Sequence, residues 1–356
     1  MPIARATPML TRGLVLTAPR TLVLQPFDLP PLGPDSVRVR VAGCGVCHTD
    51  ISFYTGQVRT RHPLPLVLGH EIAGTVVDAP PGHAHLVGRD VLVPAVIPCG
   101  DCHLCRSGHD TACLQQIMPG NHVHGGFANE IVVPARHLVT LDADRGGYAL
   151  ADLSVVADAV TTPYQALERA AVGSGDLVVV VGAGGIGTYA VQIAKARGAR
   201  VAVIDIDPAK IERLEPFGID WSFNAREVDG GAIKKRLLAG SGTGTSWKIF
   251  EMSGTLAGQE LAWSLLVPAA TLGVIGFTMD KPQVRLSNLM ALDAHAFGSW
   301  GCSPSLYADA LALVVSGRVT LRPFIEQRPM DDGPGLFARL SDAHEGSGRR
   351  VILIPG

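Results

Sequence analysis

The chain has 356 residues, of which 47% are hydrophobic, and its formal net charge is −2. A chain of this length can bury a large core and favours two domains. The nearly balanced charge gives no general case for binding nucleic acid or an anionic membrane, so we expect a small-molecule substrate. Residues 1–5 lack an apolar segment followed by a cleavage site, and no run is long enough to span a bilayer. Most of the cysteines stand in candidate metal sites, which suits a reducing compartment, and we expect a cytoplasmic enzyme.

Short strands are predicted in the first part of the chain. Residues 37–41, 72–77 and 88–93 have strand-like apolar patterns and are separated by Gly, Pro and His. We therefore expect a β-rich domain that extends to about residue 157.

Two segments beside these strands carry residue types that bind metals. Cys47 stands in Gly-Val-Cys-His-Thr-Asp, and His70 stands in Leu-Gly-His-Glu. A catalytic zinc takes three protein ligands and keeps one position open, and these residues supply two of the three. Asp50 and Glu71 each follow a candidate ligand closely and could orient it. A lone Cys or His is more often a plain core or surface residue, so on their own these segments leave both interpretations open.

A cysteine cluster follows, made of Cys99, Cys102, Cys105 and Cys113. Two residues separate each of the first three, and seven separate the third from the fourth. A short loop with this spacing can place four thiolates around one tetrahedral Zn²⁺ in a closed structural site. Disulfides or unrelated thiols are the alternative, but cysteines two residues apart favour a metal. We expect a structural zinc lobe over residues 94–115.

The pattern changes at residues 177–181, an aliphatic run typical of a strand buried on both faces. A helical pattern over 188–197 and a second aliphatic strand over 201–205 complete a βαβ unit, whose crossover should be right-handed. Further strands at 249–251 and 271–276 extend a parallel sheet.

A glycine loop, Gly182-Ala-Gly-Gly-Ile-Gly187, joins the first of these strands to the helix and fits G-x-G-x-x-G. Gly182 permits the tight turn, Gly184 lets the backbone approach a pyrophosphate, and Gly187 lets helix and strand pack closely. Gly185 and Ile186 complete the loop, and the helix N-terminus offers free N–H groups to the phosphates. The loop therefore predicts a dinucleotide site.

The end of the next strand indicates which dinucleotide binds. Asp205 follows Gly187 by eighteen residues, near the ~20 expected for a carboxylate on the ribose. An aspartate there accepts from a 2′-hydroxyl and repels a 2′-phosphate, and residues 206–207 supply no Arg, so NAD is favoured over NADP. A structural glycine turn with a solvated aspartate is the alternative.

Residues 307–315 begin a helix that we expect to return to the first domain. The predicted fold class is α/β. It consists of a discontinuous catalytic domain, residues 1–157 and 304–356, with a doubly wound parallel-sheet domain, residues 158–303, inserted in it.

With these motifs in place, the chain resembles the zinc-dependent medium-chain alcohol dehydrogenases over essentially its full length. Residues 298–301, Gly-Ser-Trp-Gly, support the resemblance in the second half. It implies a GroES-like catalytic domain, a Rossmann domain that binds NAD, and two zinc ions per subunit, one catalytic and one structural. It also implies a homo-oligomer, either a dimer or a tetramer.

The resemblance also implies the third ligand of the catalytic zinc. The position where the family usually has Cys matches Asp158, so the ligands would be Cys47, His70 and Asp158. Because oxygen donates less electron density than sulfur, the zinc should be a somewhat stronger Lewis acid. A helix N-cap or turn residue is the alternative for Asp158.

Further roles follow from the same resemblance. Thr49 matches the position whose hydroxyl takes the substrate proton, and the family often completes the relay with a His three residues later. This chain has Ser52 there, so the proton exit is open among Ser52, the ribose hydroxyls and His48. Glu71 would assist exchange of water and product, Asp50 would support the site, and Thr162 would contact the cofactor.

Four stretches resemble more narrowly the 6-hydroxycyclohex-1-ene-1-carbonyl-CoA dehydrogenases of anaerobic benzoyl-CoA degradation; they are residues 94–100, 118–121, 157–166 and 285–294. This implies NAD-dependent oxidation of a cyclic allylic secondary alcohol, carried as a CoA thioester, to the 6-oxo enone. Because that product is a polarised enone, 1,4-hydride return (ene-reductase activity) is an expected side reaction. Arg59 and Arg61 could meet the CoA phosphates, with solvated surface charge as the alternative.

The main alternative is an NAD-dependent dehydrogenase of free cyclic, allylic or polyol secondary alcohols. If the chain were a non-catalytic NAD- or zinc-binding sensor, we would expect the three metal ligands to be incomplete. The same holds for a zinc-free quinone reductase of the same superfamily. Both are disfavoured because the three ligands and Thr49 are all present.

Overall fold

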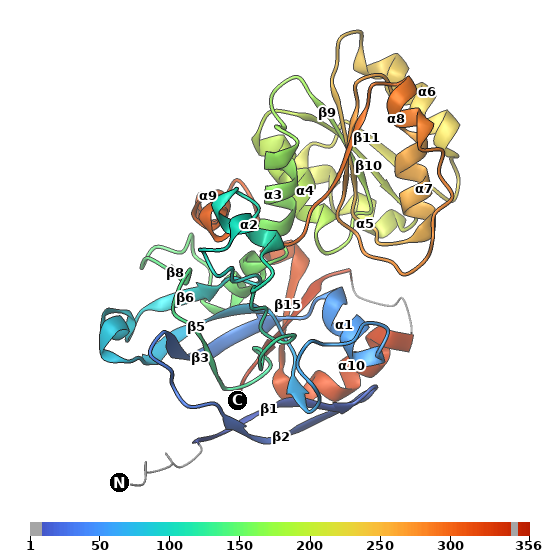
Figure 1. Ribbon diagram of the computed structural model, residues 1–356. Helices are drawn as coiled ribbons and strands as arrows, with labels where there is room; N and C mark the ends of the chain where they lie inside the picture. Colours follow the sequence, from blue (N-terminus) through green and yellow to red (C-terminus); the bar gives the residue numbers. More distant parts are fainter. Residues whose placement is uncertain (1–8, 343–347) are drawn as a thin grey trace, which may run out of the picture. The chain divides into compact units, whose positions relative to one another are not determined.

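The computed structural model describes residues 9–342 and 348–356 (Figure 1). Residues 1–5, from which the expectation about a leader was drawn, lie outside this range. The chain divides into two compact units. Unit 1 contains the described residues up to Thr161 together with Gly301–Val315 and Phe324–Gly356, and unit 2 contains Thr162–Trp300 and Ser316–Pro323.

Unit 1 is built on two sheets. A three-stranded sheet has the order β2-β1-β4, and a seven-stranded sheet has the order β15-β16-β3-β5-β6-β8, with β7 paired to β3. The strands are β1 (Met9–Ala18), β2 (Thr21–Leu29), β3 (Ser36–Gly45), β4 (Leu66–Val67), β5 (Glu71–Asp78), β6 (Asp90–Val93), β7 (Glu130–Pro134), β8 (Val139–Thr140), β15 (Ile325–Pro329) and β16 (Arg350–Ile354). The α-helices are α1 (His48–Thr55), α2 (His103–Arg106), α9 (Tyr307–Val315) and α10 (Gly333–Asp342).

The core of unit 1 lies between these sheets and the helices α1 and α10. Leu14, Val39, Ile72, Phe127 and Phe337 are fully buried in one cluster. The pairing β3–β5 is antiparallel and brings Gly45 opposite Glu71. The segments that carry Cys47 and His70 therefore leave the sheet side by side.

The strands expected over 37–41 and 72–77 lie within β3 and β5. The expected strand over 88–93 begins later, at Asp90, because Gly88 has a φ of +81° and the amide of Arg89 donates to Leu86 in a turn. The long hairpin β1–β2 was not among the predicted elements.

Unit 2 is a six-stranded sheet of order β11-β10-β9-β12-β13-β14, parallel throughout. Its strands are β9 (Leu177–Val181), β10 (Arg200–Asp205), β11 (Trp221–Asn224), β12 (Trp247–Glu251), β13 (Thr271–Val274) and β14 (His295–Gly298). Its helices are α3 (Thr161–Arg169), α4 (Gly187–Ala196), α5 (Pro208–Glu212), α6 (Gly230–Ser241), α7 (Leu256–Ser264) and α8 (Ser287–Ala291). Figure 1 shows α4 on one face of this sheet and α6–α8 on the other. The predicted α/β fold class is confirmed.

Most predicted elements of unit 2 match the observed ones closely. The strand expected over 177–181 is β9, and the expected helix over 188–197 is α4, one residue earlier at each end. The strand expected over 271–276 ends at Val274, because the amides of Ile275 and Gly276 both donate to one carbonyl of the neighbouring strand β12, that of Glu251, and the regular ladder stops there.

The domain boundaries expected at 157/158 and 303/304 differ from those of the compact units by a few residues. Asp158 belongs to unit 1, and residues 316–323 group with unit 2. The helix expected over 307–315 is α9, in unit 1. Across the described ranges, none of the helices is both long and apolar enough to traverse a lipid bilayer.

Candidate metal centres and dinucleotide site

The four cysteines of the predicted lobe come together in unit 1 in the geometry that zinc requires. They are one of the metal-competent groups of the described residues. Their Sγ atoms are separated by 3.8 Å (Cys99–Cys105), 3.5 Å (Cys102–Cys105), 3.7 Å (Cys102–Cys113) and 3.5 Å (Cys99–Cys113). A tetrahedron with Zn–S distances of about 2.3 Å has edges of about 3.8 Å. The donor set therefore fits zinc.

Backbone amides support the thiolates of this lobe. The amides of Cys102 and Gln115 donate to the Sγ atoms of Cys99 and Cys113, at 3.4 and 3.3 Å. The backbone amide of Cys105 is the main cause that lowers the pKa of the Cys102 thiol to about 6, whereas Asp101 beside Cys99 raises the pKa of that thiol to about 12. Since a metal ligates thiolates, zinc binding would release the remaining protons.

A second cluster of donors lies at the end of β3 and the start of β5. Ligand atoms of Cys47, His70, Glu71 and Asp158 lie within 4.8 Å of one another. Asp158 Oδ2 is 3.6 Å from Cys47 Sγ and 3.6 Å from His70 Nε2. Asp158 follows the 3-10 helix Ala151–Ala157 and comes to Cys47 from 111 positions away. The Asp158 side chain faces Cys47 and His70, as the ligand interpretation requires.

Asp50 contacts two of these residues, Cys47 and His70. The amide of Cys47, the N-cap of α1, donates to Asp50 Oδ2 at 2.9 Å, and His70 Nδ1 lies 3.2 Å from Asp50 Oδ1. The amide of Gly69 also donates to Oδ1, at 3.2 Å. A carboxylate on Nδ1 fixes the ring and leaves Nε2 as the metal donor. Asp50 thus contacts both segments that carry the candidate ligands Cys47 and His70.

Charges inside the cluster favour a thiolate at Cys47 and a protonated ring at His70. Burial opposes ionisation of Cys47, but His70 and Arg350 outweigh it, so that the pKa of the thiol lies below its ordinary value. Burial disfavours the His70 imidazolium, yet Asp50, Asp158 and Cys47 together raise its pKa well above the ordinary range. The site is therefore strongly anionic in its ligands, and a divalent cation would replace the proton that His70 otherwise holds.

Glu71 forms a buried ion pair with Arg350. Arg350 Nη1 donates to Glu71 Oε1 at 2.5 Å, and Glu71 has no exposed surface. Burial raises the pKa of Glu71 well above its ordinary value, and Arg350 opposes that shift. The second oxygen, Oε2, is buried and makes no hydrogen bond to any residue that the structure describes. Glu71 Oε2 is therefore available to approach a metal ion in the cluster.

The predicted proton-relay residues occupy α1. Thr49 Oγ1 lies 3.7 Å from Cys47 Sγ, so its hydroxyl adjoins the cluster. Ser52 is buried, and its hydroxyl donates to the His48 carbonyl at 3.2 Å. His48 is exposed at the first turn of the helix. The structure therefore brings Thr49 to the site and directs the Ser52 hydroxyl to the helix backbone.

The glycine loop of unit 2 has the conformation of a dinucleotide cradle. Gly182 has a φ of +99°, and a Cβ there would stand 2.6 Å from the Ser253 amide. A Cβ on Gly187 would strike the Gly182 carbonyl. At Gly184, by contrast, a Cβ would meet nothing within 4 Å. That open side is what a pyrophosphate approaching the backbone needs. Gly185 and Ile186 lead into α4, with Ile186 as its N-cap.

Asp205 lies at the carboxyl end of β10, as predicted. Its Oδ2 accepts from the Ala183 amide at 2.7 Å, and its Oδ1 accepts from the Asp207 amide at 2.9 Å. Each carboxylate oxygen retains a further lone pair for a ribose hydroxyl. Thr162 lies in the first turn of α3 and is buried.

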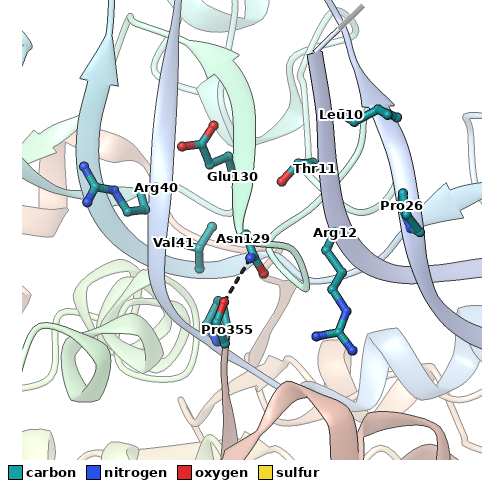
Figure 2. Close-up of a pocket in the computed structure, with 10 residues that line it drawn as sticks. Leu10, Thr11, Arg12, Pro26, Arg40, Val41, Asn129, Glu130 and Pro355 are labelled. Atoms are coloured by element: carbon teal, nitrogen blue, oxygen red, sulfur yellow. Dashed lines mark hydrogen bonds between the residues drawn. The ribbon is translucent and has the colours of Figure 1, made fainter.

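A separate concavity of about 650 Å³ lies over β1, β3 and β7. Figure 2 shows Arg12, Arg40 and Glu130 around it, with Asn129 donating to the backbone of Gly356 at 3.0 Å. None of its lining residues belongs to either metal cluster. It adds nothing to the candidate site.

Arg350 is the functional residue that the sequence interpretation missed. It begins β16, which pairs with β3 and so reaches Glu71 from 279 positions away. The arginine pair Arg349-Arg350 before an apolar strand resembles a solvated strand end, so only the pairing of β16 could have drawn attention to Arg350.

Two family models match the chain, "Alcohol dehydrogenase GroES-like domain" over residues 33–143 and "Zinc-binding dehydrogenase" over residues 185–316. An alcohol dehydrogenase of Geobacillus stearothermophilus is 27% identical over 90% of this chain and 93% of the relative. The L-galactonate-5-dehydrogenase of Escherichia coli (strain K12) is 27% identical over 93% of this chain and 94% of the relative. Among solved structures, galactitol-1-phosphate dehydrogenase from Escherichia coli is 25% identical with a TM-score of 0.87, covering 97% of this chain and 100% of that one.

Proposed function

Because this chain belongs to the zinc-binding alcohol dehydrogenase family, we propose that it oxidises a secondary alcohol to a ketone, with NAD⁺ as the hydride acceptor. The observation that carries this proposal is the convergence of Cys47, His70 and Asp158 within 4.8 Å, with Thr49 beside them. One sulfur, one nitrogen and one oxygen donor form a three-ligand set of the catalytic type.

Cys47, His70 and Asp158 would hold a zinc ion, which would supply a Lewis acid that lowers the pKa of an alcohol hydroxyl, and bound NAD⁺ would supply the hydride acceptor. Thr49 accepts the hydroxyl proton, since its Oγ1 adjoins Cys47. We place the proton exit at His48 or the ribose hydroxyls, because the Ser52 hydroxyl already donates to a backbone carbonyl.

The ion pair Glu71–Arg350 gives the site a carboxylate that can move. Oε1 is held by Arg350, whereas Oε2 is buried without a hydrogen bond. We propose that Glu71 approaches the open side of the site while water and product exchange, as a temporary oxygen donor.

NAD is the proposed cofactor in preference to NADP, on the strength of Asp205. We expect Asp205→Ala to lower the ratio of kcat/KM with NAD⁺ to that with NADP⁺ by roughly 10- to 100-fold, because a hydrogen bond to a charged group is worth about 1.5–3 kcal/mol. Initial rates with both cofactors measure this ratio. Asp207→Ala is the matched control, since that carboxylate caps α5 through the Ala209 amide at 3.0 Å. An unchanged ratio in the Asp205 variant would remove the ribose role.

The substrate we propose is a cyclic allylic secondary alcohol carried as a CoA thioester, 6-hydroxycyclohex-1-ene-1-carbonyl-CoA, with ene-reduction as a side reaction. In support, the segment after α1 is basic and touches the loop before β7. The amides of Arg61 and His62 contact Asn121, both at 2.8 Å. Burial, and after it the charge of Arg61, lower the pKa of His122, so this part of the loop lies close to the Arg61 guanidinium. Residues 51–70 contain no carboxylate, which suits an anionic substrate tail.

A free polyol is the second candidate substrate, and the relatives favour it. The names of two of them, L-galactonate-5-dehydrogenase and galactitol-1-phosphate dehydrogenase, identify open-chain polyol substrates. The same basic segment would suit a carboxylate or phosphate on such a polyol.

Kinetics distinguish the two candidates. We expect kcat/KM for the CoA thioester to exceed that for the free alcohol and for galactitol 1-phosphate by about 100-fold or more, since a remote charged tail contributes binding energy of several kcal/mol. The double variant Arg59→Gln/Arg61→Gln should raise KM for the thioester and leave the free alcohol unaffected, with Arg89→Gln as an exposed-arginine control. Preference for the polyol would refute the thioester and leave the dehydrogenase proposal intact. No turnover of any alcohol would refute both.

We further propose a homo-oligomer, a dimer or a tetramer, in a cytoplasmic setting. β14 is the last strand of its sheet, and within the described residues it pairs with β13 alone. Leu286 and Met290, just before β14, are 70% and 78% exposed. An open edge beside exposed apolar side chains suits pairing with a second copy about a two-fold axis. The unpaired cysteines of the metal sites suit a reducing compartment.

A further inference from the structure

Tyr307, the first residue of α9, is fully buried and none of the roles above uses it. Its hydroxyl makes two hydrogen bonds to backbone groups far away in the sequence. It donates to the carbonyl of Ala157 and accepts from the amide of Ala95 at 3.1 Å. The ring packs with Ala157 and Cys302 in a small cluster of its own.

The hydrogen bond to the Ala157 carbonyl brings the Tyr307 hydroxyl next to a candidate metal ligand. Ala157 ends the 3-10 helix and directly precedes Asp158, whose carboxylate faces Cys47 and His70. Asp158 has backbone angles of φ −140° and ψ −56°, outside both helix and strand, so regular secondary structure does not hold it in place. The buried Tyr307 hydroxyl holds the carbonyl of Ala157, and this restricts where the Asp158 side chain can point.

The second bond reaches toward the four-cysteine lobe. Ala95 stands at the start of the segment that leads to Cys99. Just before α9, Ser303 donates to Asp110 Oδ2 at 2.5 Å, and the Asp110 carbonyl accepts from the Cys113 amide at 3.0 Å. The segment around the start of α9 thus contacts both the backbone before Asp158 and the lobe.

We propose that Tyr307 is a positioning residue for the catalytic metal site. Its hydroxyl fixes the peptide before Asp158 and connects this peptide to the segment that enters the four-cysteine lobe. The proposal rests on the proposed function in that Asp158 is a metal ligand. It assigns Tyr307 no contact with substrate or cofactor.

The test is metal affinity, measured separately at the two sites. In Tyr307→Phe, the ring stays and both backbone groups lose their partner. We expect the affinity of the Cys47/His70/Asp158 site for zinc to fall about 10- to 100-fold, the usual effect of losing an outer hydrogen bond at a metal ligand. Competition with a chelator gives this value. In the cobalt-substituted protein, the visible bands of the catalytic site should shift while those of the four-thiolate site stay.

Tyr54→Phe is the matched control. Tyr54 is also a buried tyrosine of unit 1, and its hydroxyl likewise donates to a backbone carbonyl, that of Arg20, at 3.1 Å. It should lose a similar amount of thermal stability with no change in metal affinity or cobalt spectrum. Equal metal affinities in the Tyr307 and Tyr54 variants would overturn the proposal.

Replacing Tyr307 with 4-aminophenylalanine supplies an N–H donor in place of the O–H. We expect it to restore the zinc affinity and the cobalt spectrum, because it can still donate to the Ala157 carbonyl. If the phenylalanine variant yields no folded protein, this variant decides alone, and an altered cobalt spectrum would contradict the proposal. A wild-type protein with no metal at the Cys47 site would instead refute the proposed function, independently of Tyr307.

Discussion

Cys47→Ala or His70→Ala should lower kcat/KM for the alcohol by about a thousandfold or more, because a Lewis acid at this position is worth several kcal/mol of barrier. Each variant should also lose one of two zinc ions per subunit. The affinity for NAD⁺ should remain within a factor of about two, since the glycine loop and Asp205 belong to the other unit. Initial rates, elemental analysis and a fluorescence titration with NADH measure these three quantities.

Cys44→Ala is the matched control for this prediction. Cys44 is a fully buried thiol of β3, three residues before Cys47, but it is outside the donor cluster. It should lose some stability through a small cavity and keep both zinc ions. Substantial turnover in the Cys47 or His70 variant would show that the reaction does not depend on this cluster.

The second large effect is expected in the four-cysteine lobe. Cys102→Ser should remove the structural zinc and lower the melting temperature by about 10 °C. Binding energy at such sites is folding energy, and a loss of roughly 4 kcal/mol corresponds to about 8–16 °C for a folding unit of roughly 150–250 residues. Differential scanning calorimetry with and without added zinc measures the shift, and the catalytic site should retain its own zinc.

Leu114→Ala controls for substitution within the lobe itself. Leu114 adjoins Cys113 and is 82% exposed, so it should change neither zinc content nor melting temperature. If Cys102→Ser melted like the wild type while lacking one zinc, the lobe would not depend on a metal for its stability.

The sequence was most informative where a local pattern has only one structural use. The aliphatic run 177–181, the glycine loop and Asp205 lie within one continuous segment, and their spacing alone predicted the βαβ unit that is observed. The four-cysteine lobe is likewise local, since its ligands span fifteen residues. Continuous buried strands and short ligand loops leave few alternatives.

The catalytic cluster could be predicted only in part, because its members come from distant segments. Cys47 and His70 gave a local signal, whereas Asp158 was proposed from family resemblance alone, as an Ala-Asp-Ala sequence specifies nothing by itself. Arg350 and Tyr307 reach the site only through the strand pairing of β16 and the placement of α9. A charge at a strand end or a tyrosine at a helix start has no sequence pattern that reveals such a partner.

The most direct test is a crystal structure of the purified protein with anomalous scattering recorded at the zinc absorption edge. We expect two peaks per subunit, one enclosed by the four thiolates and one bound by Cys47 Sγ, His70 Nε2 and Asp158 Oδ2. A single peak confined to the four-cysteine lobe, or a second peak to which Asp158 contributes no oxygen, would contradict the proposed catalytic site.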